Sequence, residues 1–446
     1  MPQASIAVCR EAAAGSIEVG ELIDQRPMSA TQRLVVVLCA AAMIVDGYDI
    51  MVMALAVPSV AKAWRLEASS FGLALSAVVI GISVGSGFLG PLGDRFGRRT
   101  MLIIGMALAG GSTAATALAA SPTQFVIWRL ITGTALGVCI PSIAALTSEY
   151  APLAHRSLAM GFMNSGPPIG AFSAGFIAPP VLAAFGWRGA FLIGGIGPLL
   201  IAVLALALPE SLKFLLVRQA SNARIARALR RVAPDVDPAR LHARTPEATQ
   251  QRSPLTLLKE PYTARTLLLW GLVWLNLFNL YVLVSWLPTI LQQAGWSSDA
   301  ALRGSVLIQA GGVLGGLTMA RFLDRGATKP TMITGFALLT ICLALFKVVP
   351  SGAGWAVLLL LIGVGVSGSQ LSLNTLSAAY YPPAIKATGV GWTLLVGGIG
   401  SIVAPLVGGA LIQAQVTPVS IVALLSLPAA LCVVGVALLR PQWQAH

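Results

Sequence analysis

Residues 90–99 read GPLGDRFGRR, a polar turn between two long apolar segments. Its acid–base pair, Asp94-Arg95, recurs 230 residues later as Asp324-Arg325, again after an apolar segment. We interpret these turns as parts of a gate, because an acid can pair with a base or cap a helix end and arginines can bridge neighbouring helix ends. The alternative is a basic turn that only sets membrane orientation. The residues assigned to the gate are Asp94, Arg95, Arg98, Arg99, Glu149, Asp324, Arg325 and Lys386.

The offset of 230 residues superimposes further landmarks. Tyr150 falls on Tyr380 and Gly105 on Gly335. The other coincidences pair Gly81 with Gly311, Gly85 with Gly315, Pro152 with Pro382, Arg156 with Lys386 and Gly161 with Gly391. This agreement at one offset predicts two parallel repeats related by an axis along the membrane normal, an arrangement found in transporters that rock two bundles about a central site.

Composition restricts the class of protein. The chain has 446 residues, of which 56% are apolar and 10% are charged, whereas soluble domains average about 25% charged residues. A soluble enzyme, a disordered protein and a nucleic-acid binder are therefore excluded. Because one membrane span needs about 20 apolar residues, twelve spans would take about 240 residues, close to the apolar share of this chain.

We predict an all-α polytopic membrane protein with twelve transmembrane helices in two pseudo-symmetric six-helix bundles. The apolar segments lie near 34–60, 71–92, 101–120, 125–147, 157–182, 189–208, 266–290, 302–323, 330–349, 355–378, 388–412 and 417–439. The predicted units are an N-terminal segment (1–33), the first bundle (34–208), an arginine-rich linker (209–265), the second bundle (266–439) and a tail (440–446).

Basic residues are distributed unevenly along the chain. With 1–33, the linker and the tail on one side of the membrane, most of the 29 Lys and Arg residues lie on that side. The exceptions are Lys62, Arg65, Arg188, Arg303 and Lys347 on the other side, and Arg129 inside a span. Basic residues accumulate in cytoplasmic loops, so both termini are predicted to be cytoplasmic. The expected location is the bacterial inner membrane, without a cleavable signal peptide.

The first span contains two acids, Asp46 and Asp49, in the run Asp46-Gly47-Tyr48-Asp49. A spacing of three residues places both on one helical face, and burial in an apolar segment favours the protonated carboxyl. We therefore predict that Asp46, Asp49 and Arg129 carry proton coupling. The alternative is a structural cluster in which Arg129 neutralises the acids and no titration occurs.

Arg129 lies in the fourth predicted span. A charge at the centre of a span costs roughly 2.5–3.5 kcal/mol, so such a residue usually has a partner and a task. Arg129 begins about one turn into the span, so its side chain could also extend to the membrane interface. Both interpretations stay open at this stage.

Amides occupy the equivalent positions in the second half, since Asp46 falls on Asn276 and Asp49 on Asn279. Amides hydrogen-bond but do not ionise, so we expect proton chemistry in the first half and substrate binding in the second. Span 10 adds a polar stripe that includes Gln370 and Asn374, and a stripe within lipid must face protein or a wet cavity. The predicted substrate-binding residues are Tyr48, Asn164, Trp274, Asn276, Asn279, Tyr281, Gln309, Gln370, Asn374 and Trp392. Interhelical hydrogen bonding and an interfacial aromatic belt are the alternatives.

The sequence contains no nucleotide-binding GxxxxGK[ST] motif, so ATP-driven transport is not expected. His155, His242 and His446 are scattered, and the five cysteines lack metal-ligand spacing. We expect no enzymatic activity, no metal and no other cofactor, with the proton as the coupling ion. The expected partners are a small organic acid, the proton and membrane lipid, with no nucleic acid, and the chain is expected to be monomeric.

The 90–99 turn, Arg129 and the closing Pro209-Glu210-Ser211 resemble the major facilitator superfamily. Together with the span 1 acids, Glu149 and the run 381–392, they are similar to the aromatic acid:proton symporter family over residues 34–439. The resemblance implies uptake of benzoates, hydroxybenzoates or related acids by proton symport with alternating access. It assigns roles to Asp46, Asp49, Asp94, Arg129, Glu149, Asp324 and Lys386.

Three positions depart from the family pattern. The family often has a base in the Gly-rich run where Gly398 stands, an arginine at Lys386 and a histidine near Lys329. The run 166–170 also distantly resembles an antiporter motif of drug exporters. A drug/proton exporter of the same fold and a non-transporting membrane sensor therefore remain the alternative functions.

Overall fold

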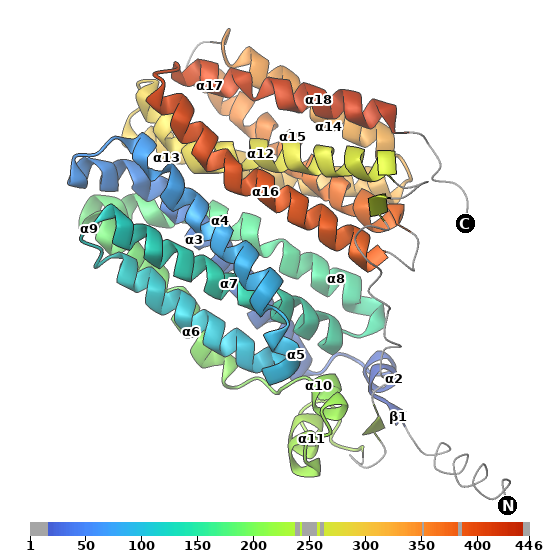
Figure 1. The fold of residues 1–446 in the computed structure, drawn as a ribbon. Helices are drawn as coiled ribbons and strands as arrows, with labels where there is room; N and C mark the ends of the chain where they lie inside the picture. Colours follow the sequence, from blue (N-terminus) through green and yellow to red (C-terminus); the bar gives the residue numbers. More distant parts are fainter. Residues whose placement is uncertain are drawn as a thin grey trace, which may run out of the picture.

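The computed structural model describes residues 17–236, 241–242, 257–258, 263–349, 352–381 and 386–439. These ranges are almost entirely helical (Figure 1). The predicted tail 440–446 lies outside them.

The first half begins with short elements and continues in long helices. Its elements are β1 (Ile17–Glu18), α2 (Val19–Asp24), α3 (Ala30–Trp64), η1 (Ala68–Phe71), α4 (Gly72–Val84), the π-helical η2 (Gly85–Leu89), α5 (Leu92–Phe96), α6 (Arg98–Thr116), α7 (Pro122–Tyr150), α8 (Leu153–Asn164) and α9 (Gly166–Ala205). The linker contains α10 (Leu212–Val217), α11 (Asn222–Leu229) and β2 (Leu241–His242).

The second half repeats this order. Its helices are α12 (Thr263–Gln293), α13 (Ser298–Asp324), α14 (Thr328–Leu345), α15 (Ala353–Tyr380), α16 (Lys386–Gln413), α17 (Pro418–Leu424) and α18 (Ser426–Leu438). Adding 230 to the bounds of α6 or α7 gives those of α14 or α15 to within one residue at either end. The helix boundaries thus follow the internal repeat seen in the sequence.

Ten stretches of the described residues are long and apolar enough to cross a membrane. One of them, Leu153–Ala205, is 53 residues long and holds two spans, because the backbone of Gly186 leaves the helical conformation at φ 63°. α6 packs between α7 and α9 but is less apolar, since it begins with Arg98 and Arg99. With these two helices included, the twelve predicted spans are accounted for.

Local sequence explains where the long helices begin. The Ser29 hydroxyl accepts a hydrogen bond from the backbone N–H of Gln32, and the Gln32 side chain accepts one from the backbone of Ser29. This capping box satisfies N–H groups that a helix start leaves free. Ser121 caps α7 in the same way and is followed by Pro122, which needs no N–H partner at that position.

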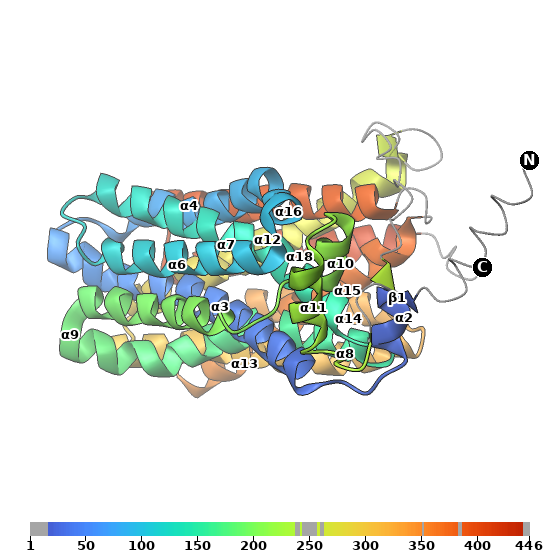
Figure 2. The same cartoon turned by 90° about the horizontal axis from the view of Figure 1, so that it is seen from below.

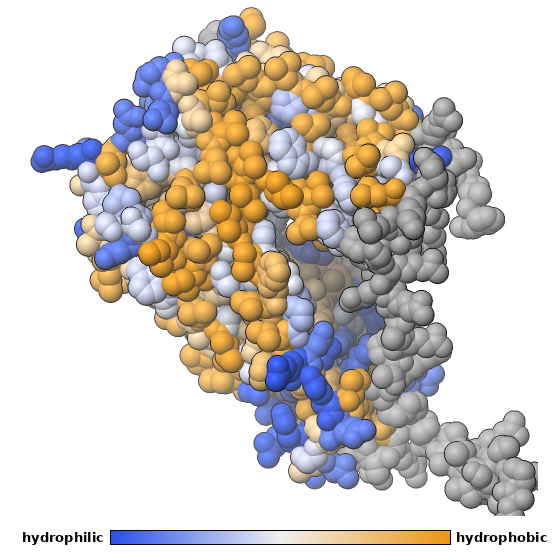
Figure 3. All heavy atoms as spheres, viewed as in Figure 1, coloured by the Kyte–Doolittle hydropathy of each residue, from blue (hydrophilic) through white to orange (hydrophobic). Residues whose placement is uncertain are grey.

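The outer faces of the helices are apolar (Figure 3). On α18, Leu427, Leu431, Val434 and Leu438 are all exposed at helical spacing. An exposed apolar face of this kind suits contact with lipid.

The two halves form separate bundles that meet most closely at one end (Figure 1). There, the Ser76 hydroxyl of α4 donates to the backbone oxygen of Ile402 in α16 at 2.8 Å. Gly175 of α9 lies against Val306 of α13. The surface is hollowed between the bundles toward the other end (Figure 3). We call these the closed end and the linker end, because α10, α11 and α2 gather at the latter (Figure 2).

The linker end carries a small cluster of its own. β1 pairs in parallel with β2, with Ile17 opposite Leu241 and Glu18 opposite His242. Apolar side chains of α2, α10 and α11 pack together beneath this pair. The N-terminal segment and the linker are therefore joined in space, which the sequence pattern alone did not predict.

Candidate functional site

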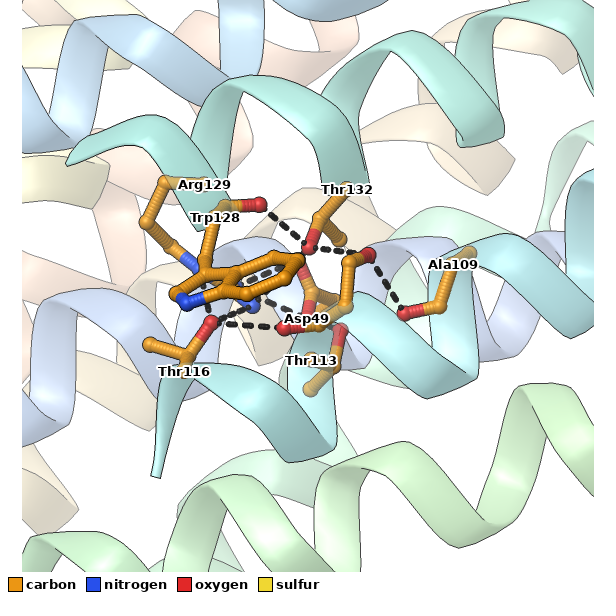
Figure 4. A network of polar contacts seen from close by, with 8 residues as sticks. Asp49, Ala109, Thr113, Thr116, Trp128, Arg129 and Thr132 are labelled. Carbon is orange, nitrogen blue, oxygen red and sulfur yellow. Dashed lines mark hydrogen bonds and ion pairs between the residues drawn. The ribbon is translucent and has the colours of Figure 1, made fainter. Parts of the chain in front are cut away.

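An ion pair lies buried inside the first bundle (Figure 4). Arg129 of α7 points inward to Asp49 of α3, with its Nη1 at 3.1 Å from Oδ1 and 3.2 Å from Oδ2. The exposed fractions are 0% for Arg129 and 3% for Asp49. Arg129 therefore does not extend to a membrane interface, and its charge is compensated within the bundle.

Hydroxyl groups complete the surroundings of this pair. Thr113 of α6 donates to Asp49 Oδ1 at 3.0 Å. Thr116 and Thr132 accept hydrogen bonds from the guanidinium group, and the ring of Phe191 lies 4.9 Å from its central carbon. Four helices thus contribute to one polar network inside an otherwise apolar bundle.

Asp46 has a different environment from Asp49. Its side chain is buried, and its Oδ1 has no hydrogen-bond partner. It lies within electrostatic range of Asp49, of Cys139 on α7 and of Tyr281 on α12. Asp46 is thus positioned between the two halves, whereas Asp49 is enclosed in the first.

Gly47 explains how α3 and α9 approach each other beside the acids. A Cβ atom at Gly47 would overlap the backbone of Pro167, and one at Gly170 would overlap the backbone of Ile44. The run 166–170 is therefore used here for close helix packing. Its resemblance to an exporter motif has this structural explanation.

A chain of amides connects two helices of the second bundle. The Asn276 Nδ2 of α12 donates to Gln370 Oε1 at 2.8 Å and to the backbone oxygen of Val366 at 3.2 Å, both in α15. Gln370 donates in turn to Asn374 Oδ1 at 3.1 Å. The chain begins at a fully buried residue and ends at an exposed one, so it can pass hydrogen bonding from the helix interface to a ligand.

Several predicted binding residues retain unused hydrogen-bonding capacity. Asn279 is fully buried, and neither its oxygen nor its nitrogen has a partner. The Tyr48 hydroxyl and the Asn276 Oδ1 are also buried without a partner. Gln309 is buried as well, whereas Asn164 is exposed and lies apart from this group at the end of α8.

Aromatic rings accompany the amides on α12. Trp274 stacks on Phe278 with centroids 5.5 Å apart, and Trp392 of α16 stacks on Trp270 at 6.0 Å. Tyr281, half-buried on the same helix, lies near Asp46 of the first half. The tryptophans are thus arranged along the helix pair α12–α16, which borders the first bundle.

The predicted gate residues of the first half lie together at the linker end. Arg98 Nη2 is 2.9 Å from Asp94 and 3.5 Å from Glu149. The Glu210 carboxylate accepts from the backbone N–H groups of Arg99 and Ser211, each at 3.0 Å. This cluster links α5, α6, α7 and the start of the linker.

Further contacts attach the linker to the same cluster. The Ser211 hydroxyl donates to Glu149, and Arg218 donates to the backbone oxygen of Asp94. Arg99 reaches the backbone oxygens of Ala205 and Leu206 at the end of α9.

The remaining gate residues are not joined to this cluster. Arg95 is exposed and lies over the ring of Phe96, and Arg325 lies over the ring of Phe322. The side chains of Asp324 and Lys386 lie outside the described part of the chain. The structure therefore assembles the gate cluster from the first repeat.

A separate ion pair fixes the N-terminal segment to the linker. Arg26 donates to both carboxylate oxygens of Asp235, at 2.5 and 2.6 Å. These hydrogen bonds lower the pKa of Asp235 from 3.8 to about 2. Asp24, two residues before Arg26, accepts from the backbone of Leu153 and from Arg156 of α8.

Sequence reasoning missed the hydroxyl groups around Arg129. One signal was present, because Thr132 follows Arg129 by three residues and so shares its helical face. A second was the group Ser112, Thr113 and Thr116 inside an otherwise apolar segment. Glu210 was recognised as part of a motif, but its role as a cap for α6 depends on tertiary structure.

Comparisons with known proteins give consistent matches along the whole chain. The family model described as Major Facilitator Superfamily matches residues 39–405 and again 305–443. The chain is 34% identical over 420 residues to a gallate transporter of Pseudomonas putida, covering 93% of each protein. It is 34% identical over 428 residues to the 4-hydroxybenzoate transporter PcaK of Pseudomonas putida, covering 94% of this chain and 95% of that one. A solved inward-open structure of the xylose transporter XylE from E. coli is similar with a TM-score of 0.71 and 19% identity, covering 92% of this chain and 96% of that one.

Proposed function

Because the chain belongs to the Major Facilitator Superfamily, we propose that it imports a small aromatic carboxylate by proton symport with alternating access. The predicted fold, the family resemblance and the assignment as a transporter rather than an enzyme are confirmed by the matches. The chain is an integral membrane protein, and its substrate is a small organic acid. Two relatives named for gallate and 4-hydroxybenzoate support an aromatic acid in particular.

The proposal places the linker end in the cytoplasm of a bacterium and the closed end outside the inner membrane. The linker end holds the arginine-rich segment, in agreement with the distribution of basic residues. In this placement the described conformation is open toward the cytoplasm and closed toward the outside. The transporter would act as a monomer, in membrane lipid and without a cofactor.

The observation that carries the coupling proposal is the set of buried charges. Among the described residues, the buried charged side chains are Asp46, Asp49 and Arg129. With both acids ionised, the set has a net charge of about −1, which repels an anionic substrate. One proton brings the net charge to zero, and two protons leave the charge of Arg129 to attract a carboxylate. The substrate anion is therefore expected to bind after the acids are protonated.

This order of events defines the energetics. A monoanion carried with one proton moves no net charge, so only the pH gradient would drive it. A monoanion carried with two protons moves one positive charge inward, which gains about 2.3 kcal/mol per 100 mV. That gain corresponds to roughly 40-fold accumulation, because each 1.4 kcal/mol is tenfold. The two acids of α3 favour the second stoichiometry.

The amide chain and the aromatic rings of α12, α15 and α16 would hold the substrate ring and its polar substituents. Amides and aromatic side chains suit a small planar molecule with a few hydrogen-bonding groups. The Gly397-Gly398 run provides no base for the carboxylate. Arg129 is thus the cation that the proposal assigns to charge compensation.

Purified protein in liposomes tests the function directly. Uptake of labelled 4-hydroxybenzoate, gallate and benzoate should follow an inward proton gradient and stop with a proton uncoupler, whereas counterflow should continue. A potassium diffusion potential at equal pH should drive uptake if two protons are carried and leave it unchanged if one is carried. Outward movement of lipophilic cations would indicate an exporter instead, and absence of any counterflow would indicate a sensor.

A further inference from the structure

Arg129 is held by more than its ion pair. Its Nη2 donates to Thr116 at 2.9 Å and to Thr132 at 3.1 Å, and its Nε donates to Thr116 at 3.2 Å. Asp49 contacts a different nitrogen, Nη1. The hydroxyls and the carboxylate thus bind separate sides of the guanidinium group (Figure 4).

The two threonines are oriented as acceptors by their own helices. Thr116 donates its hydroxyl proton to the backbone oxygen of Ser112, and Thr132 donates to that of Trp128, each at 2.9 Å. Both are bonds to the residue four positions earlier, a common use of threonine inside a helix. Because each hydroxyl has one proton, its lone pairs remain for the arginine.

The second half has no equivalent of this network. At the offset of 230 residues, Arg129, Thr116 and Thr132 correspond to Leu359, Phe346 and Ile362. All three are buried in the apolar core of the second bundle. The hydroxyls therefore accompany the arginine and are not a general property of helices at these positions.

We propose that Thr116 and Thr132 are positioning residues that keep the Arg129 guanidinium in place when Asp49 takes up a proton. This inference rests on the proposed proton symport. When a proton binds an Asp49 oxygen, the Nη1 group loses its anionic partner, while Nη2 and Nε keep their three hydrogen bonds. The guanidinium then stays buried with Nη1 free, and a substrate anion becomes its new counter-charge. Without the hydroxyls, Arg129 depends mainly on Asp49.

The groups that could also affect this titration are few. On α3 they are Asp46 and Tyr48, both within electrostatic range of Asp49. Asp46 in turn faces Cys139 of α7 and Tyr281 of α12. α6 and α9 present Thr113 and Phe191 to the pair, which do not titrate.

The experiment replaces the hydroxyls by methyl groups of the same shape. Thr116→Val and Thr132→Val, singly and together, should reduce the maximal rate of proton-driven uptake at least tenfold in the double variant. The pH optimum of uptake should move to lower pH, because an Arg129 that depends on Asp49 opposes its protonation. Thr116→Ser and Thr132→Ser should restore both the rate and the optimum.

The matched control is Thr134→Val on the same helix. Its hydroxyl is exposed and donates to the backbone oxygen of Leu130, so it shares the local bond but not the arginine. Wild-type rate and pH optimum in both single valine variants would overturn the inference. A rate loss that serine does not rescue, with an unmoved optimum, would reduce the threonines to a structural role and also overturn it. If the wild-type protein shows no proton dependence, the proposed function fails instead.

Discussion

Asp46 and Asp49 lie on one face of α3, yet Asp49 is paired with Arg129 while Asp46 Oδ1 is buried without a hydrogen-bond partner. The two carboxyl groups therefore differ in what their loss would do. Removing the charge of Asp49 leaves a buried arginine without its counter-ion, which typically costs 3–5 kcal/mol. Removing that of Asp46 breaks no bond of this kind.

We predict that Asp46→Asn abolishes gradient-driven uptake but leaves counterflow and thermal stability close to wild type. Asp49→Asn should lower both uptake and thermal stability. Transport assays and unfolding measurements on the same liposome or detergent preparations would check this. Unchanged accumulation by Asp46→Asn would remove Asp46 from the coupling mechanism.

Asn279 provides a test of function against stability. Its unpartnered amide atoms each cost roughly 1–3 kcal/mol when buried. We therefore expect Asn279→Leu to raise the melting temperature while lowering uptake. Asn276→Leu is the control, because its amide is bonded to Gln370 and its loss should destabilise the protein. A stabilised Asn279→Leu variant with full transport would show that this amide has no role in binding.

Gly47 allows α3 to pack against the backbone of Pro167. Gly47→Ala should destabilise the protein by roughly 1–3 kcal/mol, the usual effect of inserting a methyl group into a packed interface. Gly161→Ala should be neutral, because open space surrounds Gly161. Melting temperatures of both variants in detergent would test the packing, and equal values would contradict it.

The Ser76–Ile402 hydrogen bond joins the bundles at the closed end. Ser76→Ala should weaken closure there by about 0.5–1.5 kcal/mol, a shift of roughly two- to twelve-fold in the ratio of the two states. Spin-label distances across the closed end should then show a larger open population. Ser83→Ala is the control, since that hydroxyl bonds only within α4.

The contact between Arg26 and Asp235 should not respond to pH in the physiological range. The pKa of Asp235 is lowered from 3.8 to about 2, so the contribution of this pair is complete above pH 5 and is lost as the pH falls through 2. Proteolysis of the linker should thus have the same rate between pH 5 and 8. Asp235→Asn should increase that rate at every pH in this range.

The long helices, the repeat and the acids of α3 could be read from sequence because membrane spans are governed by length and apolarity. Arg129 could be recognised as buried, but its partner could not be chosen without the crossing of α3 and α7. The association of β1 with β2 connects residues more than 200 positions apart, and no local pattern encodes it. The closed end likewise depends on helix crossings, where Ser76 finds a backbone oxygen rather than a side chain.

Asn279 illustrates the limit of arguments from the repeat. Its position matches Asp49, but the surrounding positions in the second half are leucine, isoleucine and phenylalanine. A polar residue can therefore keep its place in a repeat while losing its neighbours. Only the packing of the second bundle distinguishes the two environments.

Within the described residues, the cluster around Arg98 and Glu210 takes its partners from the first half and the linker. The short helices outside the membrane are thus bolted to one of the two moving bodies. A fluorophore on α11 would travel with that body as a passenger. Its distance to a reference dye on α12 would record the swing of the transporter from outside the bilayer, leaving the pathway of the substrate untouched.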